Sequence, residues 1–379
     1  MHNIKSVAIG IRNVNTKSGL GKILLEQVTD YLARGVDVVI YTSKYDKQIA
    51  RTGVKIVKIM RIPFVGEYYQ RLLFAKLAEK EILKAQHSLV IGHGDLIHQD
   101  IMFLHNLVEK AYVLTHGKKM SPLNNIAKIR RLILNKQKFK LLIANSNLMK
   151  NELITSFQVP ADKIRVVYPG FDPKQFNREQ HAIVRSQIRQ TLSIDPSTLV
   201  IGFITSGDFK KRALDLFIEA LHNLPEKIKY KVLLVGKDKN LPKFLELAKA
   251  YNLDNKFIIK EPIDAVEQYF HATDFTVHPA HFEEFGMVVQ EAMACGVPVI
   301  TSKLVGASEL MIDQSTVMDT PNITDLTAQI NKLASQPILR EQLSISVQES
   351  VHKTSWEAYV KNLSVLIDPL FKDLKNNCD

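Results

Sequence analysis

Hydrophobic residues along this chain gather in short runs, separated by longer stretches in which they recur every three or four positions. The short runs are rich in Val, Ile, Leu and Phe, and several are continuous rather than alternating, which is typical of strands covered on both faces. We therefore predict twelve β-strands, at residues 6–11, 37–42, 55–59, 89–92, 102–105, 141–145, 165–168, 200–205, 231–235, 257–260, 275–278 and 297–301.

The alternation of these strands with helical stretches indicates parallel βαβ units. The pattern restarts near residue 200, after a polar stretch, and a chain of 379 residues exceeds the usual size of one domain. We expect an α/β fold of two doubly wound, Rossmann-like domains that face a cleft, with ligands at the carboxyl ends of the strands. The expected domains are residues 1–173 and 174–355, and residues 356–372 of the segment 356–379 read as a closing amphipathic helix.

Charge is unevenly spread over the two halves. Residues 1–173 hold 27 Lys and Arg against 13 Asp and Glu, a net of +14, whereas the rest of the chain holds 23 against 26, a net of −3. This asymmetry indicates that the first half meets an anionic partner, and nucleic acid and an anionic lipid surface are both candidates. Charge that serves only solubility is the plainer interpretation.

One basic stretch, residues 118–140, carries no acidic residue, and its apolar positions recur at nearly helical spacing. Such a segment is typical of a basic amphipathic helix that lies on an anionic membrane. We assign Lys128, Arg130 and Arg131 to a candidate membrane or acceptor patch. A packed helix with a solvated basic face is the alternative.

The two cysteines, Cys295 and Cys378, form no disulfide framework, which favours a reducing compartment. The first ten residues lack the pattern of a signal peptide, and no apolar run approaches the 18 residues of a membrane span. We expect a cytoplasmic protein.

The segment that starts at Glu283 reads as a loop, a helix and a strand. Gly286 would let the backbone approach a ligand at the helix start, where free N–H groups and the helix dipole favour a phosphate. Glu291 lies further along the helix, where a carboxylate suits a ribose diol. Gly296 is a typical helix stop. The segment therefore predicts a nucleotide site.

Two further loops carry chemistry of the same kind. Gly19 and Gly21 follow the first strand and open a helix, so they allow close approach to a phosphate or sugar, although the third glycine of the dinucleotide fingerprint is missing. Lys211 and Arg212 follow the first strand of the second half, close after Ser206, and adjacent cations there can clamp a diphosphate leaving group. An ordinary strand-to-helix turn and a solvated basic loop are the alternatives.

His105 closes one of the apolar runs, where the carboxyl end of a strand would point it into the cleft. A lone histidine is more often structural, and His93, His98 and His116 lie nearby. No histidine shows metal-ligand spacing with cysteines or carboxylates, so we predict no zinc site.

Glu283 and Glu291, eight positions apart and followed by Ala-Met-Ala-Cys-Gly-Val-Pro-Val-Ile, resemble the E-x7-E motif of the retaining glycosyltransferase family 4. That family has the GT-B fold and uses nucleotide-sugar donors. The Gly-Asp-Phe-Lys-Lys-Arg loop and residues 236–244 are similar to the lipopolysaccharide core glucosyltransferase I group of the family. The acceptor-binding half resembles that group poorly.

The resemblance implies transfer of a hexose, from a UDP-sugar in particular, to a saccharide or glycolipid acceptor in lipopolysaccharide core or other envelope glycan synthesis. It implies a metal-independent enzyme without a cofactor, peripheral on the inner face of the cytoplasmic membrane, with no nucleic-acid partner and a closing helix that crosses back to the first domain. The resemblance assigns catalytic roles to His105, Lys211, Arg212 and Glu283, and donor binding to Gly19, Gly21, Ser206, Gly286, Met287 and Glu291. Within these sets, Glu283 and the Gly286–Met287 backbone would hold donor sugar hydroxyls, and Glu291 would hold the ribose.

Two other classes stay open. A nucleotide-binding or nucleic-acid-binding protein without transfer chemistry would fit the charge asymmetry. A GT-B epimerase would act on a nucleotide sugar without an acceptor.

Overall fold

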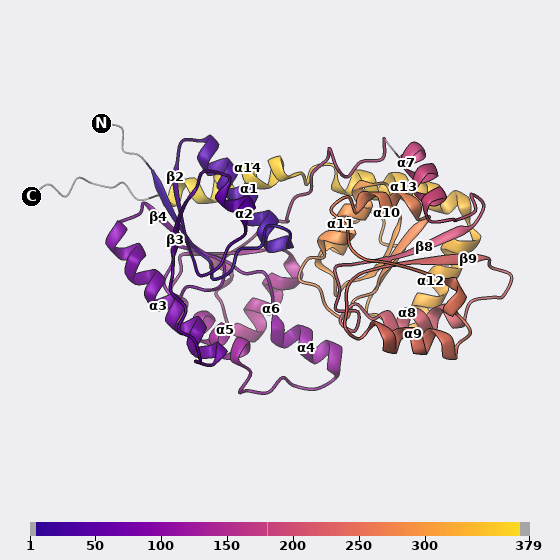
Figure 1. The fold of residues 1–379 in the computed structure, drawn as a ribbon, viewed down its shortest axis with the longest axis horizontal. Coiled ribbons are helices and arrows are strands. Elements are labelled where there is room, and N and C mark those ends of the chain that lie inside the picture. Colours follow the sequence, from indigo (N-terminus) through magenta and orange to yellow (C-terminus); the bar gives the residue numbers. More distant parts are fainter. Residues whose placement is uncertain (1–4, 180, 372–379) are drawn as a thin grey trace, which may run out of the picture. The chain divides into compact units, whose positions relative to one another are not determined.

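The computed structural model describes residues 5–179 and 181–371 of the chain. The described chain forms two compact units (Figure 1). The first unit comprises the chain up to Glu109, Lys119–Gly170 and the chain from Trp356 on, and the second comprises Lys110–Lys118 and Phe171–Ser355. The units part between Gly170 and Phe171, where the sequence suggested residue 173.

The first unit is built on a parallel seven-stranded sheet with the order β3-β2-β1-β4-β5-β6-β7. Its strands are β1 (Ser6–Gly10), β2 (Asp37–Thr42), β3 (Lys55–Lys58), β4 (Leu89–Gly92), β5 (Ile101–Phe103), β6 (Leu141–Ala144) and β7 (Ile164–Val166). Its helices are α1 (Gly19–Ala33), α2 (Lys47–Ala50), α3 (Glu67–Ala85), α5 (Asn125–Lys136), α6 (Asn147–Phe157) and α14 (Trp356–Ile367), and α4 (Val108–His116) starts in it. Short 3-10 turns lie at Ala161–Lys163 and Asp368–Leu370.

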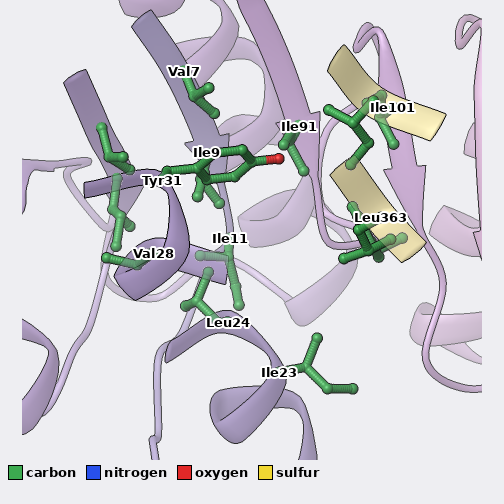
Figure 2. Close-up of a cluster of buried hydrophobic side chains, with 14 of the residues drawn as sticks. Val7, Ile9, Ile11, Ile23, Leu24, Val28, Tyr31, Ile91, Ile101 and Leu363 are labelled. Carbon is green, nitrogen blue, oxygen red and sulfur yellow. The ribbon is translucent and has the colours of Figure 1, made fainter. Parts of the chain in front are cut away.

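Alternate residues of β1 serve two different cores, as a parallel sheet covered on both faces requires. Val7 and Ile9 face α1 and α14, whereas Ala8 packs with the α3 side of the sheet. Figure 2 shows Val7 and Ile9 in the cluster that Leu363 of α14 completes. The last described helix therefore belongs to the core of the first unit.

The contact between α14 and α1 also has a polar part. Gln27 Nε2 donates to the Tyr359 hydroxyl at 3.1 Å, and Arg34 pairs with Asp368 at 2.7 Å. Burial raises the pKa of the Tyr359 hydroxyl. The helix ends at Ile367 rather than at residue 372, and residue 372 and Cys378 lie outside the described residues.

The second unit is built on a parallel six-stranded sheet with the order β10-β9-β8-β11-β12-β13. Its strands are β8 (Leu199–Ile204), β9 (Tyr230–Val235), β10 (Phe257–Lys260), β11 (Phe275–His278), β12 (Val299–Ser302) and β13 (Val317–Met318). Its helices are α7 (His181–Thr191), α8 (Leu214–His222), α9 (Leu241–Ala250), α10 (Glu267–Ala272), α11 (Met287–Ala294), α12 (Ile323–Ser335) and α13 (Pro337–Val351). Two 3-10 turns lie at Asp254–Lys256 and Gly306–Leu310.

The predicted α/β class with two parallel Rossmann-like sheets is confirmed, and each of the predicted strands is present within two residues of its expected ends. The prediction missed β13, whose two residues are too short to show a period. It also placed the end of one strand at His105, whereas β5 ends at Phe103 and leaves His105 in the following loop.

Within residues 5–179 and 181–371, every helix is too short or too polar to traverse a lipid bilayer.

Candidate functional site

The loop after β11 carries Glu283 to the carboxyl end of the second sheet. The backbone fixes this loop, because Glu283 N donates to Leu304 O at 2.9 Å and Gly306 N donates to Glu283 O at 3.0 Å. The loop ends at Gly286, which has a φ of 91°. A Cβ at Gly286 would lie 2.9 Å from Val305 Cγ1, so both the conformation and the space require glycine there.

The carboxylate of Glu283 is buried among three nitrogen groups. Arg212 Nη2 donates to its Oε1 at 3.0 Å, Lys211 Nζ donates to the same oxygen at 3.3 Å, and His278 Nε2 lies 3.3 Å from Oε2. Burial by itself would raise the pKa of Glu283, but Arg212, the His278 contact and Lys211 hold the pKa well below its ordinary value. Glu283 therefore stays ionised at neutral pH.

The two cations come from the loop between β8 and α8. Lys211 also donates to Glu284 Oε2 at 3.4 Å, so two cations face two carboxylates. Burial would lower the pKa of Lys211, but Glu283 and Glu284 raise it above its ordinary value. The structure thus brings together Lys211, Arg212 and Glu283, as the sequence predicted, and adds His278, which sequence reasoning missed. The one signal for His278 was its place at the end of a predicted strand.

The loop that holds these cations packs tightly on its neighbour. Gly207 has a φ of 147°, and a Cβ there would lie 2.3 Å from the backbone oxygen of Lys237. Phe209 is buried and its N–H donates to Asp238 at 2.7 Å. Ser206 is exposed, and its carbonyl accepts from Lys237 N at 3.3 Å. These contacts with residues 237 and 238 hold the loop in place.

Helix α11 starts directly after Gly286, with Met287 as its first residue. Glycine brings no capping side chain to the first N–H groups, so the positive end of the helix is open to a ligand. Glu291 is buried on the same helix. The helix stop at Gly296 is confirmed, since Gly296 has a φ of 71° and its N–H donates to Met293 O at 2.9 Å.

The first unit places the glycine pair at the start of α1. Ser18 caps the helix, as its Oγ accepts from Gly21 N at 3.0 Å and donates to Asn15 O at 2.7 Å. A Cβ at Gly21 would lie 1.8 Å from Asn15 O, so the fold of the loop itself requires this glycine. Gly19 is exposed. Gly21 is buried, so Gly19 is the glycine of this pair that a ligand can contact.

His105 lies two residues beyond β5 and contacts a second histidine. Its Nε2 is 2.9 Å from His93 Nδ1, and the two rings are nearly parallel, at 6°. Burial lowers the pKa of His93 to about 3, and burial, then His93 and Arg130, hold the pKa of His105 well below its ordinary value. Both rings are therefore neutral at neutral pH.

Arg130 corrects the predicted surface patch. It is only 8% exposed, and its Nη2 donates to Asn106 at 2.7 Å beside the His93–His105 pair. The expectation that Arg130 faces a membrane is wrong, because the helical period of α5 places it on the buried face, between Ala127 and Leu134.

The neighbours of Arg130 have different surroundings. Arg131 pairs with Glu109 at 2.6 Å, and Lys128 Nζ lies 4.8 Å from the centroid of the Tyr68 ring. The predicted helix over residues 118–140 is also shorter than expected. It begins at Asn125, capped by Asn124, and ends at Lys136.

Within the part of the chain that the structure describes, no group of three or more His, Cys, Asp and Glu side chains is placed to hold a metal ion.

Comparison with known proteins adds two family matches. Residues 17–175 match the model described as "Glycosyltransferase Family 4", and residues 184–349 match the model described as "Glycosyl transferases group 1". The first match covers the strands of the seven-stranded sheet after β1, and the second covers the whole six-stranded sheet.

Individual proteins are similar over most of the chain. D-inositol 3-phosphate glycosyltransferase of Thermomonospora curvata is 24% identical over 388 residues, covering 91% of this chain and 89% of that protein. Lipopolysaccharide glucosyltransferase WaaG of Escherichia coli K12 is 28% identical over 204 residues, covering 53% of this chain and 51% of WaaG.

Solved structures show the same fold. The crystal structure of WaaG, a glycosyltransferase involved in lipopolysaccharide biosynthesis, superposes with a TM-score of 0.80 at 20% identity, over 95% of this chain and 99% of that one. The Anabaena protein Alr3699/HepE in complex with UDP and glucose superposes with a TM-score of 0.77 at 17% identity, over 96% and 100% of the two chains. From the two family matches and this fold, the chain belongs to the family 4 glycosyltransferases with the GT-B fold.

Proposed function

We propose that this glycosyltransferase moves a hexose from a UDP-sugar to a saccharide or glycolipid acceptor, with retention of the anomeric configuration and without a metal or cofactor. The observation that carries the proposal is the ionised Glu283, held by Lys211 and Arg212 beside the open start of α11. The names of the similar proteins support the choice of substrates, since HepE was solved with UDP and glucose and WaaG is a lipopolysaccharide glucosyltransferase.

Glu283 would hold a hydroxyl of the donor sugar. A carboxylate offers about four acceptor positions. Arg212 Nη2 contacts both oxygens of Glu283, at 3.0 and 3.4 Å, and Lys211 and His278 contact one oxygen each, at 3.3 Å. A donor hydroxyl would replace the longest of these contacts, at 3.4 Å, and the low pKa of Glu283 keeps its carboxylate an acceptor. The backbone of Gly286 and Met287 would hold the same sugar, and Glu291 would accept from the ribose.

Lys211 and Arg212 would stabilise the leaving diphosphate. Two carboxylates already balance their charges, so the site is nearly neutral before the donor arrives. Lys211 gives two of its three N–H groups to Glu283 and Glu284 and keeps one for a phosphate oxygen. As the bond between the sugar and the diphosphate breaks, negative charge grows on the phosphate, and these cations stabilise it most in the transition state.

Retention follows if the acceptor enters on the face from which the diphosphate leaves. The electron pair of the broken bond goes to the diphosphate, the acceptor oxygen forms the new bond to the anomeric carbon, and its proton passes to the departing phosphate. His105 would lie near the donor sugar as a neutral ring, which can donate or accept a hydrogen bond there.

The test is release of nucleoside diphosphate from a panel of nucleotide sugars, with and without acceptor saccharides, in the presence of EDTA. We expect release from a UDP-hexose, faster with an acceptor, and an α-linked product from an α-linked donor by NMR. A product with inverted configuration, or loss of activity in EDTA, would overturn retention or metal independence. Binding without release, or an altered nucleotide sugar without transfer, would support the binding protein or the epimerase instead.

We further propose that the chain associates with the anionic inner face of the cytoplasmic membrane through its first unit. The support is the net charge of +14 over residues 1–173 and the acid-free stretch 118–140. Lys128 and Arg131, but not the buried Arg130, are the residues of the original patch that a membrane could contact.

Vesicle co-sedimentation tests this association. The wild type should bind anionic vesicles at low salt and less at high salt, since the Debye length falls to about 3 Å at 1 M. Equal binding to neutral and anionic vesicles would contradict the proposal. If the Lys128→Gln/Arg131→Gln double variant binds anionic vesicles as tightly as the wild type, these two residues take no part in the association.

A further inference from the structure

A groove of about 1080 Å³ opens in the first unit between α3 and the segment of residues 137–140. Asp100, which directly precedes β5, and Lys140, which directly precedes β6, both line it. The groove therefore lies at the amino ends of the strands, whereas His93 and His105 follow the carboxyl ends of β4 and β5. It is a different site from the candidate donor site.

The wall of the groove is mainly apolar. Ile82 and Phe139 are buried beneath it, and Val90 of β4 is half-buried. Leu83 stands at the rim and is 76% exposed. A large apolar side chain left this exposed next to an apolar groove is a surface that an apolar ligand would cover.

Lysines surround this apolar wall on two sides. Lys76, Lys80 and Lys84 follow one another at four-residue spacing on α3, and therefore line one side of that helix, while Lys138 and Lys140 face the groove from the other segment. Lys84 pairs with Glu81 at 2.8 Å and Lys140 pairs with Asp100 at 3.0 Å. Among the described residues, no carboxylate lies within ion-pair distance of Lys76, Lys80 or Lys138.

The two acidic residues of the lining are already engaged within the fold. Glu79 accepts from Ile97 N at 2.6 Å and contacts His98 Nδ1 at 2.9 Å. Asp100 accepts from Val90 N at 3.0 Å. The charge that the groove offers to a ligand is therefore positive.

The backbone of the groove is paired as well. Gln99 N donates to Lys138 O at 3.1 Å, Asp100 N donates to Val90 O at 2.8 Å, and Lys140 N donates to Asp100 O at 2.9 Å. The strands beside it, β4 and β5, lie inside the sheet and offer no free edge for an added peptide strand. What remains is an apolar wall with cations at its rim, which suits a ligand that needs no directional hydrogen bonds.

We propose that this groove holds an acyl chain of an anionic membrane lipid, with the lipid phosphate between Lys76, Lys80 and Lys138. This inference rests on the proposed membrane association and names the lipid and its site. The volume of about 1080 Å³ lies just above the range of about 300–1,000 Å³ for ligand pockets, which leaves room for an acyl chain as well as its headgroup. Figure 1 shows α3, which carries two of these lysines, along one side of the first unit.

The experiment uses the full chain and two soluble probes, dodecyl phosphate below its micelle concentration and butyl phosphate, in titration calorimetry. The probes share the phosphate and differ in chain length. The wild type should bind one dodecyl phosphate at least ten times more tightly than butyl phosphate. Equal affinities would overturn the proposal, because the chain would then add nothing.

Exposed residues allow variants that should not disturb the fold. Lys76→Gln/Lys80→Gln should weaken dodecyl phosphate binding, and binding to vesicles with phosphatidylglycerol, by about thirtyfold, since each of the two lysines contributes about 1 kcal/mol near an anionic surface. Leu83→Asn should weaken the binding of dodecyl phosphate but not of butyl phosphate. Lys227→Gln/Lys229→Gln removes the same charge from exposed sites of the second unit and should change neither.

These outcomes separate the groove from the rest of the proposed function. If the wild type binds neither probe but still sediments with anionic vesicles, the groove is refuted and the association through Lys128 and Arg131 stands. If only binding to an acidic amphipathic peptide responds to Leu83→Asn, the groove is a protein-docking site and the lipid proposal fails. Release of nucleoside diphosphate in solution tests the transfer reaction independently of the groove and of the membrane association.

Discussion

The two units differ in whether a buried titratable side chain keeps its charge. In the second unit Glu283 is buried and yet stays ionised, because Arg212, Lys211 and His278 surround it. In the first unit burial lowers the pKa of His93 to about 3, and the partner that its ring contacts, His105, is neutral and does not offset this effect. Burial penalises a charge in both places, and the partner decides whether the charge survives.

The difference bears on what each cluster can do. A charged, compensated cluster can respond to new charge on a substrate with little rearrangement, which suits a leaving group. A pair of neutral rings offers hydrogen bonds without attracting an anion by itself, which suits sugar hydroxyls. Four changes would break or sharpen this comparison, and they follow from the largest expected effect to the smallest.

Glu283→Gln removes the charge that balances the two cations. Removing the buried carboxylate leaves the two half-buried cations with the more distant Glu284, which should lower the free energy of unfolding by about 3–5 kcal/mol, and turnover should fall at least a hundredfold. Urea unfolding and diphosphate release measure the two effects. Glu284→Gln, which loses the charge behind the longer, 3.4 Å contact to Lys211, should have the smaller effect on both. If the two variants behave alike, Glu283 has no special place in the cluster.

Lys211→Ala and Arg212→Ala should lower turnover by about 10²–10³, which corresponds to about 2.7–4 kcal/mol. The Michaelis constant of the donor should change much less, because the charge that these residues meet grows in the transition state. Steady-state kinetics of both variants provide the check. Exposed Lys210→Ala is the matched control, and turnover near the wild-type value in all three variants would show that this loop does not clamp the diphosphate.

Glu291→Ala should weaken donor binding while the fold persists. The loss of a charge-assisted hydrogen bond to the ribose costs about 1.5–3 kcal/mol, or roughly tenfold to a hundredfold in affinity. Calorimetry with the active donor and a circular dichroism spectrum decide the matter. Unchanged affinity in the folded variant would remove Glu291 from the ribose site.

His93 should make the first unit sensitive to acid. Its pKa of about 3 in the folded chain lies below the ordinary value near 6.5, so the unfolded chain binds the proton first as the pH falls. Its contribution to stability is complete above pH 6.5 and declines between pH 6.5 and 3, reaching a loss of about 2 kcal/mol at pH 5.

Thermal unfolding from pH 8 to pH 5 checks this sign. His93→Gln should lose less stability than the wild type over that interval. The exposed His352→Gln should follow the wild type. A parallel decline of the wild type and His93→Gln would mean that His93 is protonated in the folded chain.

The sequence was sufficient to predict those features that depend on neighbours along the chain. Continuous apolar runs identified the strands, and the order Glu283, Gly286, Glu291 and Gly296 identified a loop, a helix and its end. These features have local causes, namely side-chain period, backbone conformation and helix termini, so a window of a few residues contains them.

The tertiary structure decided what distant segments do to one another. Arg130 carries the same charge as Arg131, yet it is buried beside Asn106, whereas Arg131 pairs with Glu109. The pairing of His93 with His105 and the lysine-rimmed groove likewise join segments that the sequence keeps apart. Charge and hydropathy are properties of a residue, but burial and partners belong to the packed chain, and they set whether the residue is ionised, neutral or free to bind.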